Sequence, residues 1–380
     1  MNATTETASA PQGTMGPPPL LAVLGTSWAV GAPTVAVSWD VDGQSVAFGL
    51  GNGHVLVADA KWPQGPRVQP RPGGGVDVIQ AEEPAPQPAQ AICHQGSCLA
   101  LAAHPQGGFV SGGDDGRVVH LPRSAPPVVL GQPASEWITA VAGGAEAGFA
   151  GGVAYAYGRT VHRVTSGASA SIELPAPATA LAFSPDGLVL AAAHSGGVTL
   201  WPCIGATRVL SWPGYHRALC WSPSGEYLVS AMQENALHGW RVSDGMGMEM
   251  SGYSGQPLSL SFAHDGRYLV TSGDVRPVCW SFDPPGKAQQ PAQCGMASKI
   301  PVTVVASHPR QPLIAVGYFN GAVLLCRPGS DDALFVKGSG DGAVNALAWS
   351  GDGQRLAFGS QGGQCGWLSL PEALFRSNSN

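Results

Sequence analysis

The stretch Thr179–Trp201 reads TALAFSPDGLVLAAAHSGGVTLW and sets the pattern for the whole chain. Its first part alternates in period two, the mark of a β-strand. Ser184-Pro185-Asp186-Gly187 follows as a turn whose proline and glycine fix the backbone. A second apolar run, a Ser195-Gly196-Gly197 turn and a third run ending at Trp201 complete the unit. The segment therefore predicts three short antiparallel strands.

Seven other segments align with this unit. The positions equivalent to Phe183 are Trp39, Ala103, Gly143, Trp221, Phe262, Ser307 and Trp349. From Ala103 onward they are spaced 38 to 45 residues apart, close to the period of about 40–45 residues for a four-stranded propeller blade. The first step, from Trp39 to Ala103, is longer, and the proline- and glycine-rich region 63–90 predicts a loop inserted late in the first module.

A fourth strand is expected in the gap after each unit. Ser171–Leu174, Arg208–Trp212 and Leu334–Lys337 are apolar enough to supply it, as is Val128–Leu130. After the eighth unit, only a short polar tail at 372–380 remains. We therefore expect the N-terminal run Leu20–Leu24 (LLAVL) to complete the last blade, which would close the ring and remove exposed sheet edges. Residues 1–19 are expected to be a disordered tail.

Segments such as SPSGEYLVSAMQENALHGW and SGDGQRLAFGSQGGQCGWL resemble the WD-repeat family, and the resemblance covers residues 20–371. It implies an all-β fold: a single closed β-propeller of four-stranded antiparallel blades, most simply eight, with seven as the alternative if the divergent third unit is incomplete. The sequence departs from the family in lacking its Gly-His pairs and most Trp-Asp endings. Asp115 alone matches the family's tight-turn aspartate, so a family-type His–Asp network is expected to be mostly absent.

Composition narrows the function. The 380 residues carry a formal charge of −6 and only four lysines, so no basic stripe is available for nucleic acid or for an anionic membrane surface. No signal peptide and no apolar run of about 18 residues is present, which predicts a cytoplasmic protein. Most of the eight cysteines lie in apolar strand-like runs and are expected to be reduced.

Motifs that carry chemistry are sparse. His104-Pro105 and His308-Pro309 occupy the turn position of Ser184-Pro185 and are interpreted as turn residues. Cys93, His94, Cys98 and His104 form the only local set of soft ligands, but their spacing does not suit tetrahedral zinc. No phosphate loop or nucleophile elbow is found, so we predict no enzyme, no metal and no cofactor.

The turns between second and third strands should share one rim with the connections that enter the first strands. Aromatic and arginine side chains there are typical anchors of protein interfaces. The candidate partner-binding residues are Trp137, Tyr157, Arg159, Tyr215, His216, Arg217, Tyr253, Arg276, Tyr318 and Phe319.

Two functions follow from these observations. The first is a non-catalytic scaffold or adaptor that binds a partner protein or peptide on this rim. The alternative is a metal- or small-ligand-binding propeller, which would need His194, His216 and Cys93 or His94 to converge at the channel mouth. The sequence leaves the oligomeric state open.

Overall fold

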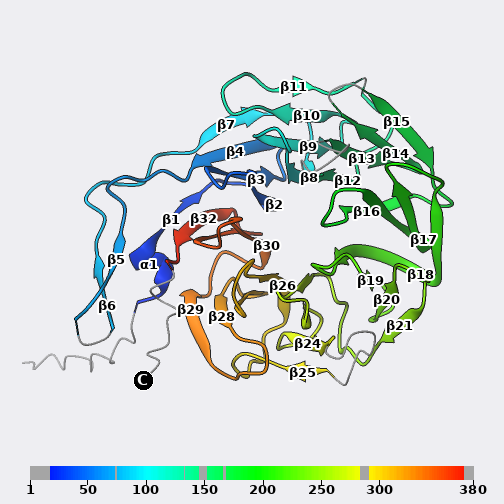
Figure 1. The fold of residues 1–380 in the computed structure, drawn as a ribbon. Helices are drawn as coiled ribbons and strands as arrows, with labels where there is room; N and C mark the ends of the chain where they lie inside the picture. Colours follow the sequence, from blue (N-terminus) through cyan, green and yellow to red (C-terminus); the bar gives the residue numbers. More distant parts are fainter. Residues whose placement is uncertain are drawn as a thin grey trace, which may run out of the picture.

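The computed structural model describes residues 18–72, 75–131, 133–144, 152–165, 168–282 and 291–371. Within these residues, the chain forms a ring of antiparallel β-sheets around a central axis, with the first strand of each module innermost and the fourth outermost (Figure 1). Of the tails predicted at 1–19 and 372–380, residues 1–17 and 372–380 lie outside the described residues. The β-propeller expected from the sequence is confirmed.

The first four modules follow one another along the chain. Their strands are β2 (Thr34–Trp39), β3 (Ser45–Leu50), β4 (His54–Asp59) and β7 (Ala89–Ile92); β8 (Cys98–Ala103), β9 (Phe109–Gly113), β10 (Val118–Leu121) and β11 (Val128–Val129); β12 (Ala140–Gly143), β13 (Val153–Tyr157), β14 (Thr160–Val164) and β15 (Ser169–Glu173); and β16 (Ala178–Phe183), β17 (Val189–Pro202) and the first part of β18 (Arg208–Trp221). The divergent third module is thus a full four-stranded sheet.

The other four modules complete the circle. Their strands are the second part of β18 with β19 (Tyr227–Met232), β20 (Leu237–Arg241) and β21 (Gly247–Met250); β22 (Leu260–Phe262), β23 (Tyr268–Thr271), β24 (Val278–Ser281) and β25 (Ala292–Gln293); β26 (Val302–Ser307), β27 (Ile314–Tyr318), β28 (Val323–Cys326) and β29 (Ala333–Lys337); and β30 (Val344–Trp349), β31 (Arg355–Ser360) and β32 (Gln364–Ser369) with β1 (Gly25–Ala29).

Module number and sheet number differ because two strands are long. Among the described residues, hydrogen bonds define seven sheets of four or more strands, one of them six-stranded. In that sheet, β17 and β18 each run for 14 residues and pass through a register shift, at Ser195/Gly197 and His216/Ala218. Counted as continuous sheets the ring has seven blades. The six-stranded sheet contains two sequence repeats, which meet in β18 where its partner changes from β17, up to Tyr215, to β19, from His216. Divided there, the ring has eight modules, one for each sequence repeat.

Contacts between first strands close the circle. Each first strand contacts the next in order, from β2 and β8 through to β26 and β30, and β30 in turn contacts β2. Indole nitrogens reinforce this ring: Trp221 Nε1 donates to the Ala182 carbonyl, and Trp349 Nε1 donates to the Ala306 carbonyl. Trp39 Nε1 donates across the closure to the Ala348 carbonyl at 3.0 Å. The repeat position that aligns the modules in the sequence therefore links each of these modules to the one before it.

An N-terminal strand does complete the last sheet, but the residues assigned to it from the sequence were wrong. Leu20–Leu24 forms the short helix α1, and β1 pairs with β32 instead, from Gly25 opposite Leu368 to Ala29 opposite Gln364. Leucine and alanine have high intrinsic helix propensity, which favours this short helix. Leu20 and Leu21 pack against an apolar cluster shared by the last two modules.

The inserted region of the first module contains its own structure. A two-stranded hairpin, β5 (Arg67–Pro70) and β6 (Val76–Ile79), projects from the ring beside α1 (Figure 1). The sequence predicted only a loop at 63–90, whereas the structure has a hairpin within this region. The chain returns to the ring in β7, which pairs with β4.

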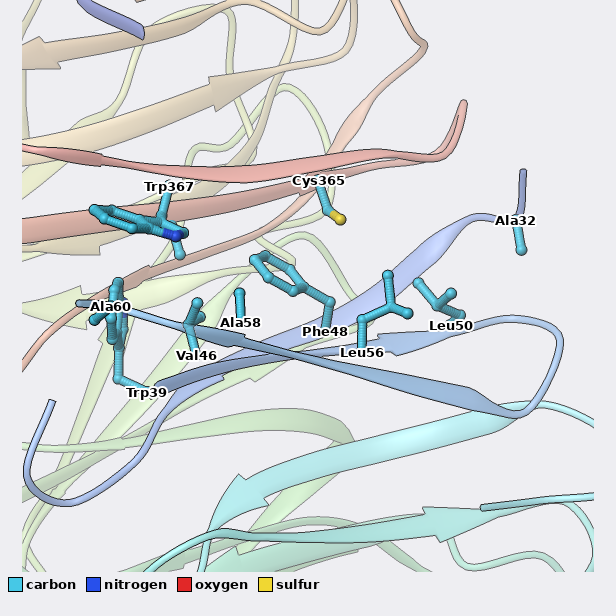
Figure 2. Packing of buried hydrophobic residues seen from close by; sticks show 11 residues of the cluster. Ala32, Trp39, Val46, Phe48, Leu50, Leu56, Ala58, Ala60, Cys365 and Trp367 are labelled. Carbon is cyan, nitrogen blue, oxygen red and sulfur yellow. The ribbon is translucent and has the colours of Figure 1, made fainter. Parts of the chain in front are cut away.

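The core lies between the sheets. One cluster joins the first module to the last sheet, where Phe48 and Leu56 face Trp367 and Cys365 (Figure 2). Trp367 is 2% exposed, and its ring centroid lies 6.3 Å from that of Trp39 in an edge-to-face arrangement. Edge-to-face pairs are a favoured aromatic geometry. The ring is thus closed by side-chain packing as well as by β1.

Candidate interaction rim

Backbone hydrogen bonds assemble one edge of the propeller from two kinds of segment. Gln233 N donates to the Tyr215 carbonyl, Phe319 N to Pro301, and Gln361 N to Ala343; each bond joins the turn between the second and third strands to the connection that enters the same module. Ala178 N and Val302 N donate to the turn of the preceding module. We call this edge the turn rim. Its turns between second and third strands are residues 51–53, 114–117, 158–159, 195–197, 233–236, 272–277, 319–322 and 361–363. Its entering connections are residues 30–33, 93–97, 133–139, 174–177, 213–215, 251–259, 294–301 and 338–343.

The opposite edge is built in the same way from the remaining turns. Cys203 N donates to the Leu188 carbonyl, and Ala60 N donates to the Gln44 carbonyl. These bonds join the connection before a fourth strand to the turn between the first and second strands. Leu188 and Ile204 are exposed there, at 41% and 78%. This edge, the opposite rim, provides an internal comparison for the turn rim.

A β-bulge at the start of the first strand shapes the mouth of the channel. The register shifts by one residue at Thr179, Thr303 and Asn345, among others. The bulged side chains bond to the next module: Thr303 Oγ1 donates to the Val344 carbonyl at 2.6 Å, and Asn345 Nδ2 to the Thr34 carbonyl at 3.0 Å. Bulges re-aim side chains in this way. The rim is therefore fixed by bonds that run from module to module.

Three of the ten predicted partner-binding residues are large, exposed aromatics. Trp137 is 65% exposed, Phe319 61% and Tyr215 42%. Arg159 and Arg217 are also exposed. The sequence therefore identified five rim positions whose side chains are presented to solvent.

Three further candidates are only partly exposed and already have partners. Tyr157 lies with its hydroxyl 3.1 Å from His162 Nε2. Arg276 donates to the Gly295 carbonyl and pairs with Asp331. The Tyr253 hydroxyl lies 2.7 Å from Thr271 Oγ1, and burial raises the pKa of this hydroxyl to about 12.

The last two candidates do not present their side chains. Tyr318 is 3% exposed within an apolar cluster between the sixth and seventh modules, and burial raises its pKa to about 12. His216 is fully buried, with Nδ1 2.7 Å from Ser230 Oγ and Nε2 3.0 Å from the Trp212 carbonyl. The prediction that Tyr318 and His216 are exposed anchors is wrong, because both side chains are buried and take part in packing or internal hydrogen bonds.

The structure groups the exposed residues by module. Thr139 N donates to the Ala156 carbonyl, which sets the connection carrying Trp137 against the turn carrying Arg159. In the fifth module, Tyr215 N donates to the Glu234 carboxylate at 3.0 Å, which fixes Tyr215 beside Arg217. Phe319 stands on the turn of the seventh module. The aromatic side chains are thus spread around the ring on rigid turns.

Sequence reasoning missed two apolar rim residues. Leu258 is 53% exposed where the sixth module begins, and Val35 is 36% exposed at the bulge of β2. Other modules place Thr179, Thr303 or Asn345 at the bulge, and these side chains bond to the next module. An apolar residue at a bulge position is the signal that could have identified Val35.

A histidine network was also missed. His94 is 2% exposed; its Nδ1 lies 3.0 Å from Asp115 Oδ1 and its Nε2 2.9 Å from Ser111 Oγ. Burial lowers the pKa of His94, against the opposing effect of Asp115. Cys93-His94 thus stands where the repeat pattern calls for Gly-His, and the second module keeps a complete network.

The residues considered for a metal are engaged elsewhere. His94 is held by Asp115 and Ser111, and Cys98 Sγ donates to the Ala100 carbonyl at 3.5 Å. His194 Nε2 lies 2.9 Å from Thr199 Oγ1. Over the described ranges, no group of three or more histidine, cysteine or acidic side chains is arranged to hold a metal ion. In the same part of the chain, no helix has the length and hydropathy needed to cross a membrane.

Two family models match parts of the sequence. The model for the WD domain, G-beta repeat, matches residues 87–120, which include the His94–Asp115 network. The model for the anaphase-promoting complex subunit 4 WD40 domain matches residues 305–378. No curated protein matches the chain by sequence.

Solved structures resemble the whole ring. Sqt1 from Chaetomium thermophilum aligns with a TM-score of 0.67 at 17% identity, over 90% of this chain and 97% of its own. The computationally designed protein Ika8 aligns with a TM-score of 0.65 at 16% identity, over 90% of this chain and 98% of its own. At these identities the likeness shows the fold.

Proposed function

We propose that the chain, a β-propeller with WD-repeat matches at residues 87–120 and 305–378, is a non-catalytic scaffold or adaptor that binds a partner protein or peptide on the turn rim. WD-repeat propellers commonly mediate protein–protein interaction. Because fold does not determine function, the proposal rests on the rim itself. The observation that carries it is the exposure of Trp137, Tyr215 and Phe319 on one edge.

Exposed aromatics on a rim have an energetic reason to bind. Every tryptophan ring buried between modules removes apolar surface from water, whereas Trp137 leaves most of its surface solvated. An exposed, rigidly mounted aromatic ring buries a large area on binding at a modest cost in conformational entropy. Trp137, Tyr215 and Phe319 therefore have the properties of binding hot spots.

Preorganised backbone supports the same proposal. Phe319 N donates to the Pro301 carbonyl at 2.9 Å, and Gly321 N to the Tyr318 carbonyl at 3.0 Å. Lys337 is 5% exposed and donates from Nζ to the Gly321 carbonyl at 3.1 Å, which stabilises this turn. A partner that contacts Phe319 would meet a turn that needs no further ordering.

Charge on the rim is mixed. Arg159 and Arg217 lie among exposed carboxylates that include Glu136 and Glu234. Such a surface suits a peptide or protein with both polar and apolar groups, in which the aromatic anchors supply affinity and the charges select the partner.

Replacing the three rim aromatics tests the proposal. We expect Trp137→Ala, Tyr215→Ala and Phe319→Ala combined to weaken partner binding at least about 30-fold, since a hot-spot residue contributes about 2 kcal/mol or more. The measurement is quantitative affinity purification from cells that naturally express the chain, followed by titration of the recovered partner.

A matched control uses the opposite rim. Leu188→Ala with Ile204→Ala removes exposed apolar side chains from the other edge of the ring and should leave binding unchanged. Both variants should unfold within about 0.5 kcal/mol of the unmodified chain because the substituted side chains are exposed. Loss of the partner from the opposite-rim variant alone would refute the proposal.

A further inference from the structure

Three buried cysteines meet between the sixth and seventh modules, in the same apolar cluster as Tyr318. Cys279 lies in β24, Cys294 directly follows β25, and Cys326 ends β28. They are 2%, 0% and 3% exposed. The Sγ atoms of Cys279 and Cys294 are 2.7 Å apart.

Strand register explains why these thiols meet. In the β24–β25 ladder, Cys279 lies opposite Ala292. Cys294 comes two residues after Ala292 and so shares the face of the sheet that carries Cys279. Cys294 N donates to the Pro277 carbonyl at 3.1 Å, which continues the pairing past the end of β25.

A glycine brings in the third thiol. Gly295 N donates to the Ser330 carbonyl at 2.7 Å, which ties this segment to the seventh module. A Cβ atom at Gly295 would lie 3.4 Å from both Cβ and Sγ of Cys326. Cys326 therefore lies beside the residue that directly follows Cys294.

The separation of the first two thiols is shorter than packing requires. Two carbon atoms rest at about 3.5–4.0 Å, and sulfur is the larger atom. A disulfide bond is about 2.03–2.05 Å long, so the sulfurs of Cys279 and Cys294 have only a fraction of an ångström to move.

The surroundings also favour one thiolate. Thiols of Cys279 and Cys326 donate to Cys294 and lower its pKa, and the positive charge of Arg276 acts in the same direction. The pKa values of Cys279 and Cys326 are raised, first because they donate these hydrogen bonds and then because they are buried. Cys294 is thus the nucleophile of the group, since the thiolate is the reactive form.

We propose that Cys279 and Cys294 form a reversible disulfide on exposure to a hydroperoxide. The Cys294 thiolate attacks one peroxide oxygen and becomes a sulfenic acid. The O–O bond breaks, and the second oxygen leaves as hydroxide or alkoxide. The Cys279 thiol then attacks the sulfenic sulfur, the S–S bond forms, and water departs with the thiol proton. A small dithiol reverses the change by thiol–disulfide exchange.

A surface pocket on the seventh module reaches the third cysteine. The pocket has a volume of about 400 Å³ and is lined by residues that include Cys326, Arg327 and Ser330. Cys326 thus borders the pocket and also forms a hydrogen bond with Cys294. It also provides a second partner for the Cys294 sulfenic acid when Cys279 is removed.

Peptide mapping of the unmodified full-length chain tests the proposal. The folded protein is treated with hydrogen peroxide, its remaining thiols are alkylated in denaturant, and the digest is analysed by mass spectrometry. We expect a cross-linked peptide pair containing Cys279 and Cys294, lighter by two hydrogen atoms than the separate peptides and lost after dithiothreitol treatment. Cys93 and Cys98, which are buried in one cluster with pKa values raised to about 11 and 12, should stay fully alkylated.

Variants sharpen the result. Cys294→Ser should abolish the cross-link, whereas Cys279→Ser should move it to Cys294 and Cys326. Cys365→Ser removes a buried cysteine from a different cluster and should leave the Cys279–Cys294 pair unchanged. Full alkylation of Cys279 and Cys294 after peroxide treatment, or equal cross-linking of Cys93 to Cys98, would overturn the proposal.

Discussion

Trp367→Ala is expected to lower the free energy of unfolding by about 3–5 kcal/mol, the usual cost of removing a large aromatic from a core. Trp367 is 2% exposed and faces Trp39 across the closure (Figure 2). Its ring centroid lies 6.3 Å from that of Trp39 and 6.2 Å from that of Trp62. The variant leaves a cavity where the last sheet meets the first module. Urea titration followed by far-UV circular dichroism measures the change.

A tryptophan-to-alanine substitution at an exposed position provides the control. Trp137→Ala removes a tryptophan that is 65% exposed and should change stability by no more than about 0.5 kcal/mol. Trp367→Phe should recover most of the loss, because the indole nitrogen of Trp367 has no hydrogen-bond partner among the described residues. Equal destabilisation by Trp367→Ala and Trp137→Ala would contradict the packing described for the closure.

Gly366→Val is expected to prevent β1 from pairing with β32. A Cβ atom at Gly366 would lie 2.2 Å from the Thr26 carbonyl oxygen and 2.8 Å from Ser27 Cα, and both are backbone atoms that side-chain motion cannot relieve. Overpacking costs about 1–3 kcal/mol, and here the displaced strand also gives up its hydrogen bonds to β32. We expect a total loss of about 3 kcal/mol or more.

Hydrogen exchange resolves this effect by position. In Gly366→Val, the amides of Gly25–Ala29 should lose protection while those of the fourth and fifth modules keep it. Gly351→Val, at a glycine where an added Cβ meets no atom within 4 Å, should leave exchange unchanged. Retained protection at Gly25–Ala29 in the Gly366 variant would mean that β1 does not close the ring.

Much of the ring could be predicted from the sequence because turn chemistry repeats. Ser184-Pro185-Asp186-Gly187 fixes its turn through Ser184 Oγ, which accepts a hydrogen bond from Val189 N, and Ser350 repeats this bond with Arg355 N. Such local bonds depend on neighbouring residues, so the sequence displays them. The eight modules and most fourth strands followed from them.

Ring closure was harder to predict because it depends on residues far apart. Leu20–Leu24 has the composition of a buried strand, yet β1 begins at Gly25, where leaving room for Leu368 requires a residue without a side chain. Gly25–Ala29 contains only one large apolar residue, Trp28. Nothing local distinguishes this segment from a loop.

The site was predicted in part for a related reason. Tyr318 and Phe319 are adjacent aromatics, and the sequence assigned both to the rim. Tyr318 ends β27 and packs inward, whereas Phe319 starts the turn and points to solvent. Both faces of β27 are buried, so no polar–apolar alternation marked the boundary. The hydrogen-bond network of His94 was missed because Cys93 replaces the glycine that precedes the histidine in the family pattern.

The most direct measurement of the central claim is site-specific photo-cross-linking in cells that naturally express the chain. A photoreactive amino acid replaces Trp137 or Phe319 on the turn rim, or Ile204 on the opposite rim, all of which are more than half exposed. Binding on the turn rim predicts the same cross-linked partner from positions 137 and 319 and none from position 204. A partner that cross-links from position 204 and from neither rim aromatic would contradict the account.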